Sequence, residues 1–171
     1  MEEVNSLVLG LGSNLGDRIA NLQEACLRIE QEIGPITSYS SVYDSPPLGF
    51  EATSTFLNMC ITCATPFFPQ TVLTKIQSIE NDLGRIRSET GYISRTLDID
   101  IIFFNHLVLT EGPALIPHPA FRERKFVLLP LNDLDASFMD PVTHLTMKEL
   151  LYTCSDDSLI SCSKKNLFSS E

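Results

Sequence analysis

The sequence predicts an α+β domain, a ferredoxin-like αβ sandwich with a mainly antiparallel sheet flanked by helices. Three observations lead to this expectation. First, 171 residues suit a single core, and a content of 43% hydrophobic and 20% charged residues is ordinary for a packed protein. Second, apolar residues alternate in some segments and recur at helical spacing in others. Third, these segments follow one another as strand, helix, strand, strand, helix, strand.

The first half of the chain supplies most of these elements. Residues 4–11 form a short apolar run that ends in a glycine turn, which predicts a buried first strand. Asp17 stands where an N-cap would begin a helix, and apolar residues recur at helical spacing until Gly34–Pro35 stops the pattern. The runs 36–43 and 56–64 are then expected to be strands.

The second half of the chain is less regular. Residues 69–83 carry one apolar face and predict a second helix, whereas the weak patterning of residues 85–95 predicts a mobile loop. Residues 98–104 are typical of a strand. Beyond it we expect a short hairpin strand at 107–109, an irregular segment at 113–119, a packed segment at 126–131 and a last helix at 147–151.

Composition also bounds the partners and the compartment. The formal net charge of −10 argues against nucleic-acid binding, which relies on basic surface. Neither a signal peptide nor an apolar run of roughly 20 residues is present, so no membrane partner is expected. The five cysteines are interpreted as free thiols of a cytoplasmic protein, and Cys60 and Cys63 would point to opposite faces of one strand. We expect residues 1–154 to form the domain and residues 155–171 a flexible tail or linker.

The glycine turn could in principle bind phosphate. Gly10, Gly12 and Gly16 lie between a strand and a helix, where phosphate loops occur, yet they match neither the dinucleotide fingerprint nor a Walker A motif. A tight turn with Asp17 as cap is the favoured interpretation, and direct phosphate binding is the alternative.

Asp98 and Asp100 are the sharpest chemical feature. Strand periodicity places both carboxylates on one face, about 6 to 7 Å apart at the backbone. A magnesium ion would relieve their repulsion, and the alternative is a solvent-facing strand with two acids. Arg85, Arg87 and Arg95 precede the pair and would suit phosphate oxygens, although they could simply balance nearby acids.

Two further features are compatible with a ligand. His118 stands between two prolines that fix its backbone, so it could contact a ligand or merely pack at the surface. Phe56 and Asn58 share one strand face, which would suit a flat heterocycle that needs stacking and edge hydrogen bonds. Without other support, a core Phe and a strand-end Asn remain the simpler interpretation.

Several spaced motifs in a fixed order give a family resemblance. From about Leu7 to about Leu151 the sequence resembles the 6-hydroxymethyl-7,8-dihydropterin pyrophosphokinase family of folate synthesis. The motifs are Gly12-Ser13-Asn14-Leu15-Gly16, Ser45-Pro46-Pro47-Leu48-Gly49, Phe56-Leu57-Asn58, Glu80-x-x-Leu83-Gly84-Arg85-x-Arg87, Arg95-Thr96-Leu97-Asp98-Ile99-Asp100, Ile116-Pro117-His118-Pro119 and Arg124-x-Phe126-Val127-Leu128-x-Pro130-Leu131.

The resemblance implies a reaction and a set of site residues. The reaction transfers diphosphate from ATP to the hydroxymethyl group of 6-hydroxymethyl-7,8-dihydropterin and releases AMP, with two magnesium ions held by Asp98 and Asp100. Arg85 and Arg95 are implied as catalytic together with the two aspartates, and Arg85 and Arg87 as part of a closing loop. The implied pterin contacts are Ser45, Pro46, Leu48, Phe56, Asn58 and Phe126, and the implied ATP contacts are Glu80, Arg87, Tyr92, His118 and Arg124.

Some positions depart from the family pattern. Phe56 stands where Tyr is common, Tyr92 where Trp is common, and Pro113 where some members have a basic residue.

Two other functions stay open. A nucleotide-binding oxidoreductase would need a parallel sheet, and a ferredoxin-like interaction domain would not consume ATP. A longer native chain could also fuse this domain to another folate enzyme, or the domain could act beside one.

Overall fold

The computed structural model describes residues 3–46, 54–84, 96–163 and 167–168. Within these ranges the elements follow the expected order, except for two strands in place of one at 36–43 and no strand at 107–109. They are β1 (Asn5–Ser13), α1 (Arg18–Glu32), β2 (Ile36–Tyr39), β3 (Tyr43–Ser45), β4 (Phe56–Thr65), α2 (Pro69–Asp82), β5 (Asp98–Phe104), the short 3-10 helix η1 (Phe121–Glu123), α3 (Lys125–Asp135), α4 (Met147–Thr153) and β6 (Ser161–Cys162).

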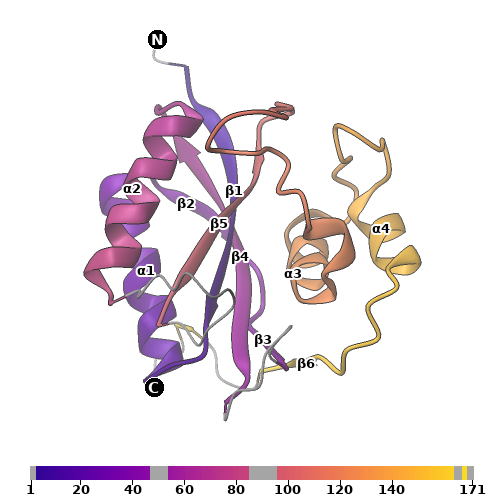
Figure 1. Ribbon diagram of the computed structural model, residues 1–171, viewed down its shortest axis with the longest axis horizontal. Coiled ribbons are helices and arrows are strands. Elements are labelled where there is room, and N and C mark those ends of the chain that lie inside the picture. The colour runs from indigo at the N-terminus through magenta and orange to yellow at the C-terminus, as the bar shows by residue number, and fades with distance from the viewer. Residues whose placement is uncertain (1–2, 47–53, 85–95, 164–166, 169–171) are drawn as a thin grey trace.

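The sheet lies between two layers of helices (Figure 1). Its strand order is β5-β1-β4-β3-β6, with β2 also paired to β4, and every pairing among the described strands is antiparallel. Helices α1 and α2 cover one face, α3 covers the other, and α4 packs against α3. The predicted α+β sandwich with an antiparallel sheet is therefore confirmed. None of the described helices is long and apolar enough to cross a bilayer.

Strand alternation divides the apolar residues between the two layers. Leu7, Leu9 and Leu11 of β1 are at most 2% exposed and pack in the cluster that contains α1 and α2. Cys60 of β4 lies in the second cluster, with α3 and α4, whereas Cys63 lies in the first. The expected opposite orientation of these two cysteines is thus confirmed. Each fully buried leucine stabilises the fold by about 1.5 to 3 kcal/mol.

The boundaries of α1 have local causes. The Asp17 carboxylate accepts a hydrogen bond from the Ala20 N–H at 3.0 Å, which confirms the predicted N-cap. After the helix, a Cβ at Gly34 would lie only 2.0 Å from the Ala64 carbonyl oxygen. Only glycine fits there, so the chain can return to the sheet immediately after α1.

Three sequence predictions need correction. The first strand does not end at residue 11 in a glycine turn but continues as β1 to Ser13, because Gly10 and Gly12 lie inside it, where neighbouring strands approach closely. The single strand expected at 36–43 is two strands, β2 and β3. No strand forms at 107–109, where Leu109 makes only an isolated bridge.

The segment expected to be a flexible tail contacts the domain where it is described. β6 pairs with β3, and the Ser163 N–H donates to the Val42 carbonyl at 2.7 Å. Further along, Leu167 is only 6% exposed and its carbonyl accepts from the Gln23 amide at 2.5 Å. A domain boundary at residue 154 remains a prediction, but residues beyond it pack on the domain.

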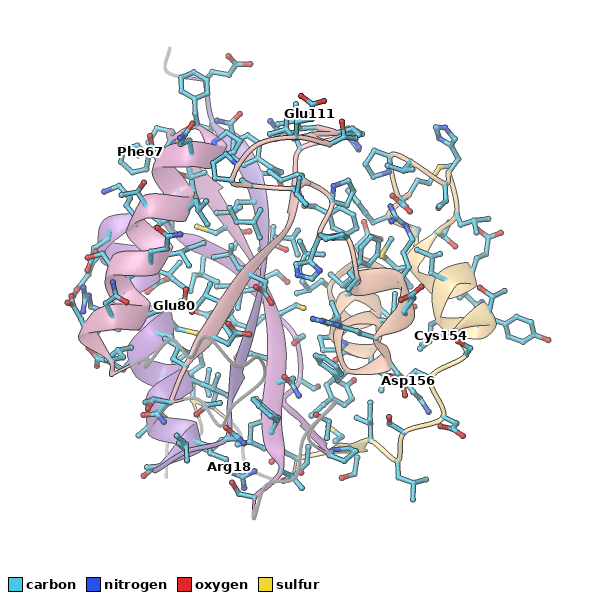
Figure 2. The ribbon with its side chains drawn as sticks, viewed as in Figure 1. Arg18, Phe67, Glu80, Glu111, Cys154 and Asp156 are labelled. Atoms are coloured by element: carbon cyan, nitrogen blue, oxygen red, sulfur yellow. The ribbon has the colours of Figure 1, made fainter. Side chains whose placement is uncertain are left out.

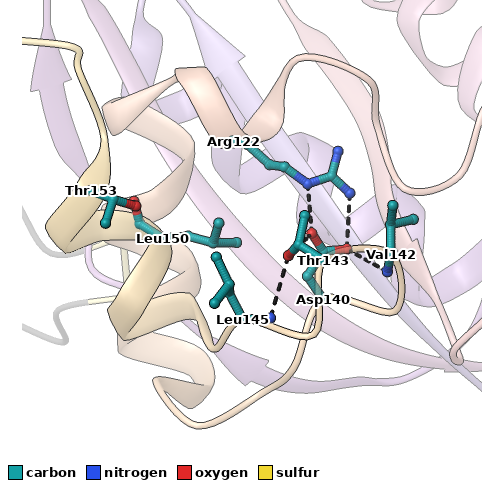
Figure 3. A network of polar contacts seen from close by, with 7 residues as sticks. All are labelled: Arg122, Asp140, Val142, Thr143, Leu145, Leu150 and Thr153. Carbon is teal, nitrogen blue, oxygen red and sulfur yellow. Dashed lines mark hydrogen bonds and ion pairs between the residues drawn. The ribbon is translucent and has the colours of Figure 1, made fainter.

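A buried carboxylate ties η1 to the turn that precedes α4 (Figure 3). Asp140 is fully buried and accepts from the Arg122 Nε and Nη2 atoms at 2.5 and 2.9 Å. It also accepts from the Thr143 hydroxyl and the Val142 N–H. Phe121, next to Arg122, is itself buried. The bidentate pair therefore fixes the chain just before α3.

We expect Asp140→Ala to lower the free energy of unfolding by about 2 to 3 kcal/mol, because Arg122 and the Val142 N–H lose their acceptor. Burial alone would raise the pKa of Asp140, but hydrogen bonds led by that from Arg122 hold it below its usual range. The stabilisation is therefore present above a pH of about 4 and is lost as the pH falls through the lowered folded-state pKa. Urea unfolding, with the exposed Glu24→Ala as control, measures this. Equal stability of both variants would contradict it.

Candidate active site

The register of β1 brings polar residues of three strands to one face of the sheet. Gly12 lies opposite Asn58 of β4 on one side and Asp98 of β5 on the other. Two residues back, Gly10 lies opposite Cys60 and Asp100 in the same way. Because side chains alternate along a strand, all of these residues face the α3 side of the sheet. The predicted common face of the two aspartates follows directly from this register.

The two glycines leave space on this face. A Cβ at Gly12 would come within 2.9 Å of the Asn58 Oδ1 atom, and a Cβ at Gly10 within 3.3 Å of Ile102 Cδ1. The first contact is closer than folded proteins tolerate and the second is tight. Because the glycines have no side chains, they leave a shallow strip of backbone between the Asn58 amide on β4 and the two carboxylates on β5.

His118 adds an imidazole beside this strip. Its backbone N–H donates to the Ile102 carbonyl at 3.1 Å, and its Nε2 atom lies 4.0 Å from the Asp100 Oδ2 atom. The Ala120 N–H donates to Nδ1, so the neutral ring carries its proton on Nε2, facing Asp100. Burial and then the Arg124 charge lower the pKa of His118, against an opposing effect of Asp98. The ring is therefore neutral at pH 7.

Asn58 has a fixed orientation. Its Nδ2 atom donates to the Ser45 hydroxyl at 2.6 Å, and both side chains are buried. The amide oxygen is consequently directed toward Gly12. Phe56, half-buried at the start of β4, lies opposite Ser45 in the β3–β4 register. Pro46, the last described residue before the gap, is exposed.

The opposite side of the site comes from the start of α3. Phe126 is half-buried and packs against the α3-side core. The Arg124 guanidinium carbon lies 5.8 Å from the centre of the Phe126 ring. Because Arg124 also influences the pKa of His118, these groups lie near one another. The bidentate pair of Arg122 and Asp140 holds the chain segment that connects His118 with Arg124 (Figure 3).

The structure brings together some of the residues predicted for the site and leaves others outside the description. Glu80 is buried in α2, on the other side of the sheet (Figure 2), and stays a prediction as an ATP contact. Pro113 is exposed in the loop after β5. The residues on the α3 side are Ser45, Phe56, Asn58, Asp98, Asp100, His118, Arg124 and Phe126. Outside the described residues lie Leu48, Arg85, Arg87, Tyr92 and Arg95.

Sequence reasoning missed the structural role of Gly10 and Gly12. They were interpreted as a turn, whereas they occupy strand positions that alternate with Leu7, Leu9 and Leu11. This period of two was a usable signal, because a glycine at every second position of an apolar strand indicates close approach by another group. The importance of Asp140 had no comparable local signal.

Comparisons with known proteins agree with this architecture. A family model of 7,8-dihydro-6-hydroxymethylpterin-pyrophosphokinase matches residues 8–136. The chain is 39% identical over 131 residues to a Bacillus subtilis 2-amino-4-hydroxy-6-hydroxymethyldihydropteridine pyrophosphokinase, covering 76% of this chain and 78% of the relative. An Aquifex aeolicus protein of the same name is 33% identical over 144 residues, covering 84% of this chain and 89% of the relative.

Other relatives are longer. The Dictyostelium discoideum folic acid synthesis protein FOL1 is 37% identical over 146 residues, which is 85% of this chain and 22% of that protein. A Plasmodium falciparum HPPK-DHPS crystal structure with pteroate superposes with a TM-score of 0.72 at 19% identity, over 89% of this chain and 42% of that one. The latter match shows the fold alone.

The fold and these matches together define an α+β pyrophosphokinase domain. More specifically, the chain belongs to the 7,8-dihydro-6-hydroxymethylpterin-pyrophosphokinase family. The polar face between β1, β4, β5 and α3 is therefore its candidate active site.

We expect Gly12→Ala to displace the Asn58 amide and to lower the free energy of unfolding by about 1 to 3 kcal/mol, because the added methyl group overlaps Oδ1. The matched control is Gly10→Ala, whose methyl group meets the Ile102 side chain at 3.3 Å and the Cys60 Sγ atom at 3.9 Å but no polar group of the site. A crystal structure of each variant and urea unfolding provide the measurement. If the hydrogen bond from Asn58 to Ser45 survives unchanged in Gly12→Ala, the proposed spatial role of Gly12 is wrong.

Proposed function

We propose that this protein transfers diphosphate from ATP to the hydroxymethyl group of 6-hydroxymethyl-7,8-dihydropterin in folate synthesis. In this reaction the hydroxymethyl oxygen forms a bond to the β-phosphorus and loses its proton. The bond from that phosphorus to the oxygen shared with the α-phosphorus breaks, and AMP leaves. The observation that carries the proposal is the β1 register, which places Asp98 and Asp100 on the same face as Asn58.

The carboxylate half of the site suits magnesium. Asp98 and Asp100 offer hard oxygen ligands, and the described residues contain no group of three acidic, His or Cys side chains that would hold a metal by themselves. Magnesium commonly takes one or two carboxylates and completes its shell with water and phosphate oxygens. We therefore propose two magnesium ions bound together with ATP. When bound, they would neutralise charge on the phosphates and orient them.

The cationic groups around ATP divide into two sets. Arg124 and the neutral His118 lie beside the aspartates. There Arg124 can attract the triphosphate through its positive charge, and His118 can donate a hydrogen bond to it from Nε2–H. Arg85, Arg87, Tyr92 and Arg95 are proposed from the family resemblance, with Arg85 and Arg95 as catalytic residues, and Glu80 as a further ATP contact.

The amide half of the site suits a pterin ring. Phe56 and Phe126 are half-buried aromatic residues on the sheet and on α3, and they can stack on the two faces of a flat heterocycle. Asn58 is held by Ser45 and can exchange directional hydrogen bonds with the ring edge. Backbone groups from Ser45 through Pro46 to Leu48 would complete that edge.

The alternatives have less support. An oxidoreductase built on the glycine turn needs a parallel sheet, whereas all described strand pairs are antiparallel. A non-catalytic domain would not account for relatives named as pyrophosphokinases. Two Arabidopsis thaliana relatives are named folate synthesis bifunctional proteins, so we also propose that this domain is fused to, or acts beside, another folate enzyme. The free cysteines support a reducing compartment, and we propose the cytoplasm.

We expect Asp98→Asn and Asp100→Asn each to lower magnesium-dependent turnover by at least about 100-fold, because each variant removes an anionic metal ligand. The fold should persist, since each change removes like charge from one strand face. ATP consumption and AMP release with the pterin alcohol provide the measurement, and Glu24→Gln on the exposed face of α1 is the control. Normal turnover in both variants would show that the carboxylates are structural.

We expect Phe56→Ala, Phe126→Ala and Asn58→Leu each to weaken pterin binding by about tenfold or more, through lost stacking area or an unpaired ring edge. The affinity for an ATP analogue should change less, because the aspartates and His118 are untouched. Phe68→Ala, at a side chain that is 76% exposed, is the matched control. Calorimetric titration distinguishes the outcomes. Unchanged pterin affinity in all three variants would place the pterin elsewhere.

A further inference from the structure

The C-terminal segment caps the helix that carries Phe126. The N-cap residue of α3, Arg124, makes no side-chain capping hydrogen bond. Instead the Asp156 Oδ2 atom accepts the Lys125 N–H at 2.9 Å, from 31 residues away in the chain. Its Oδ1 atom accepts from the Ser158 N–H and hydroxyl, which holds the carboxylate in place. The segment thus supplies from a distance a contact that most helices obtain from their own N-cap.

The charge on this cap is matched to its position. A negative side chain at a helix N-terminus is stabilised by the unpaired N–H groups and the helix dipole. Burial alone would raise the pKa of Asp156, but hydrogen bonds from Ser158 and Lys125 hold it below its usual range. Asp156 is therefore ionised at neutral pH and lies beside the first turn of α3 (Figure 2).

The same segment is also attached to the sheet. A few residues after Asp156, β6 pairs with β3, in the register Asp44 with Ser161 and Tyr43 with Cys162. The Ser163 N–H donates to the Val42 carbonyl at 2.7 Å. β3 has only three residues and ends at Ser45, whose hydroxyl holds the Asn58 amide. β6 therefore pairs with the edge of β3 that β4 leaves open.

We propose that residues 155–163 form a strap that fixes the separation of the two sides of the pterin slot, with Asp156 as a positioning residue. One end of the strap holds the start of α3 and so Phe126, and the other end holds β3 and so Ser45. This inference rests on the proposed function, because it assigns the strap a role in binding the same pterin. Asp156 itself does not touch the substrate.

The strap can act as one unit because both of its ends are anchored. Between its anchors the Ser158 carbonyl accepts from the Lys125 Nζ atom at 3.5 Å, a second contact to the same helix turn. Past β6, the burial of Leu167 in the α1 layer keeps the chain from leaving the sheet edge. Release of either end would remove the constraint between α3 and β3.

The test removes the hydrogen bond at one end of the strap, at the other end, and at both ends together. Asp156→Ala removes the cap of α3, and Ser163→Pro removes the N–H that donates to Val42. We expect each variant to raise the dissociation constant of the pterin alcohol about five- to tenfold. The double variant should raise it no further than the single variant with the larger effect, because release of either end already removes the constraint. The affinity for an ATP analogue should fall less. Calorimetric titration of the full chain provides all of these values.

Two further variants exclude a general effect on folding. Asp157→Ala changes an adjacent exposed charge and should bind the pterin alcohol normally, and Asp156→Asn keeps one carbonyl acceptor and should restore part of the affinity. Additive losses in the double variant, or unchanged pterin affinity in both single variants, would overturn the strap. A native chain that does not bind the pterin alcohol at all would instead overturn the proposed function.

Discussion

The pairing of β1 on both of its edges is the constraint on which the rest of the structure depends. A shift of β1 by one residue would turn Leu7, Leu9 and Leu11 away from α1 and α2, at a cost of about 1.5 to 3 kcal/mol for each. The same shift would replace Gly10 and Gly12 on the α3 face with larger side chains, Leu9 and Leu11 in one direction or Leu11 and Ser13 in the other. The apolar core therefore fixes the register, and the register fixes where Asn58, Asp98 and Asp100 meet.

Local patterns were sufficient to predict much of the fold. Alternating and helical apolar spacing, together with the Asp17 cap, predicted the strand and helix order, because these signals arise within a few residues. The alternation of Gly10 and Gly12 with leucines indicates that another group approaches closely, but it does not identify that group. The approaching side chains are Asn58 and Ile102, which reach the glycines from two other strands. The division of β2 from β3, and the pairing of β6 with β3, likewise depend on contacts distant in sequence.

The candidate site was predictable to different extents in its two halves. The common face of Asp98 and Asp100 follows from strand periodicity alone, and the register bears it out. The approach of His118 to Asp100 could not be derived from spacing, since the loop that carries His118 returns to β5 and is fixed there by the hydrogen bond from the His118 N–H to the Ile102 carbonyl. The roles assigned from family resemblance, including those in residues 85–95, stay predictions.

Different interactions fix the two sides of the site. Asn58 and the aspartates lie on strands held by backbone pairing and by apolar packing, which leave little freedom of position. On the other side, α3 packs on an apolar cluster as well. The N-terminal end of α3, however, is held by two carboxylates: Asp140, which binds Arg122, and Asp156, which accepts from the Lys125 N–H. Directional polar contacts of this kind determine orientation as well as distance. In the proposed site the substrates fit between the two sides. The exact positions of Asn58 and the aspartates on the sheet would therefore serve binding only if these polar contacts also align α3 with the sheet.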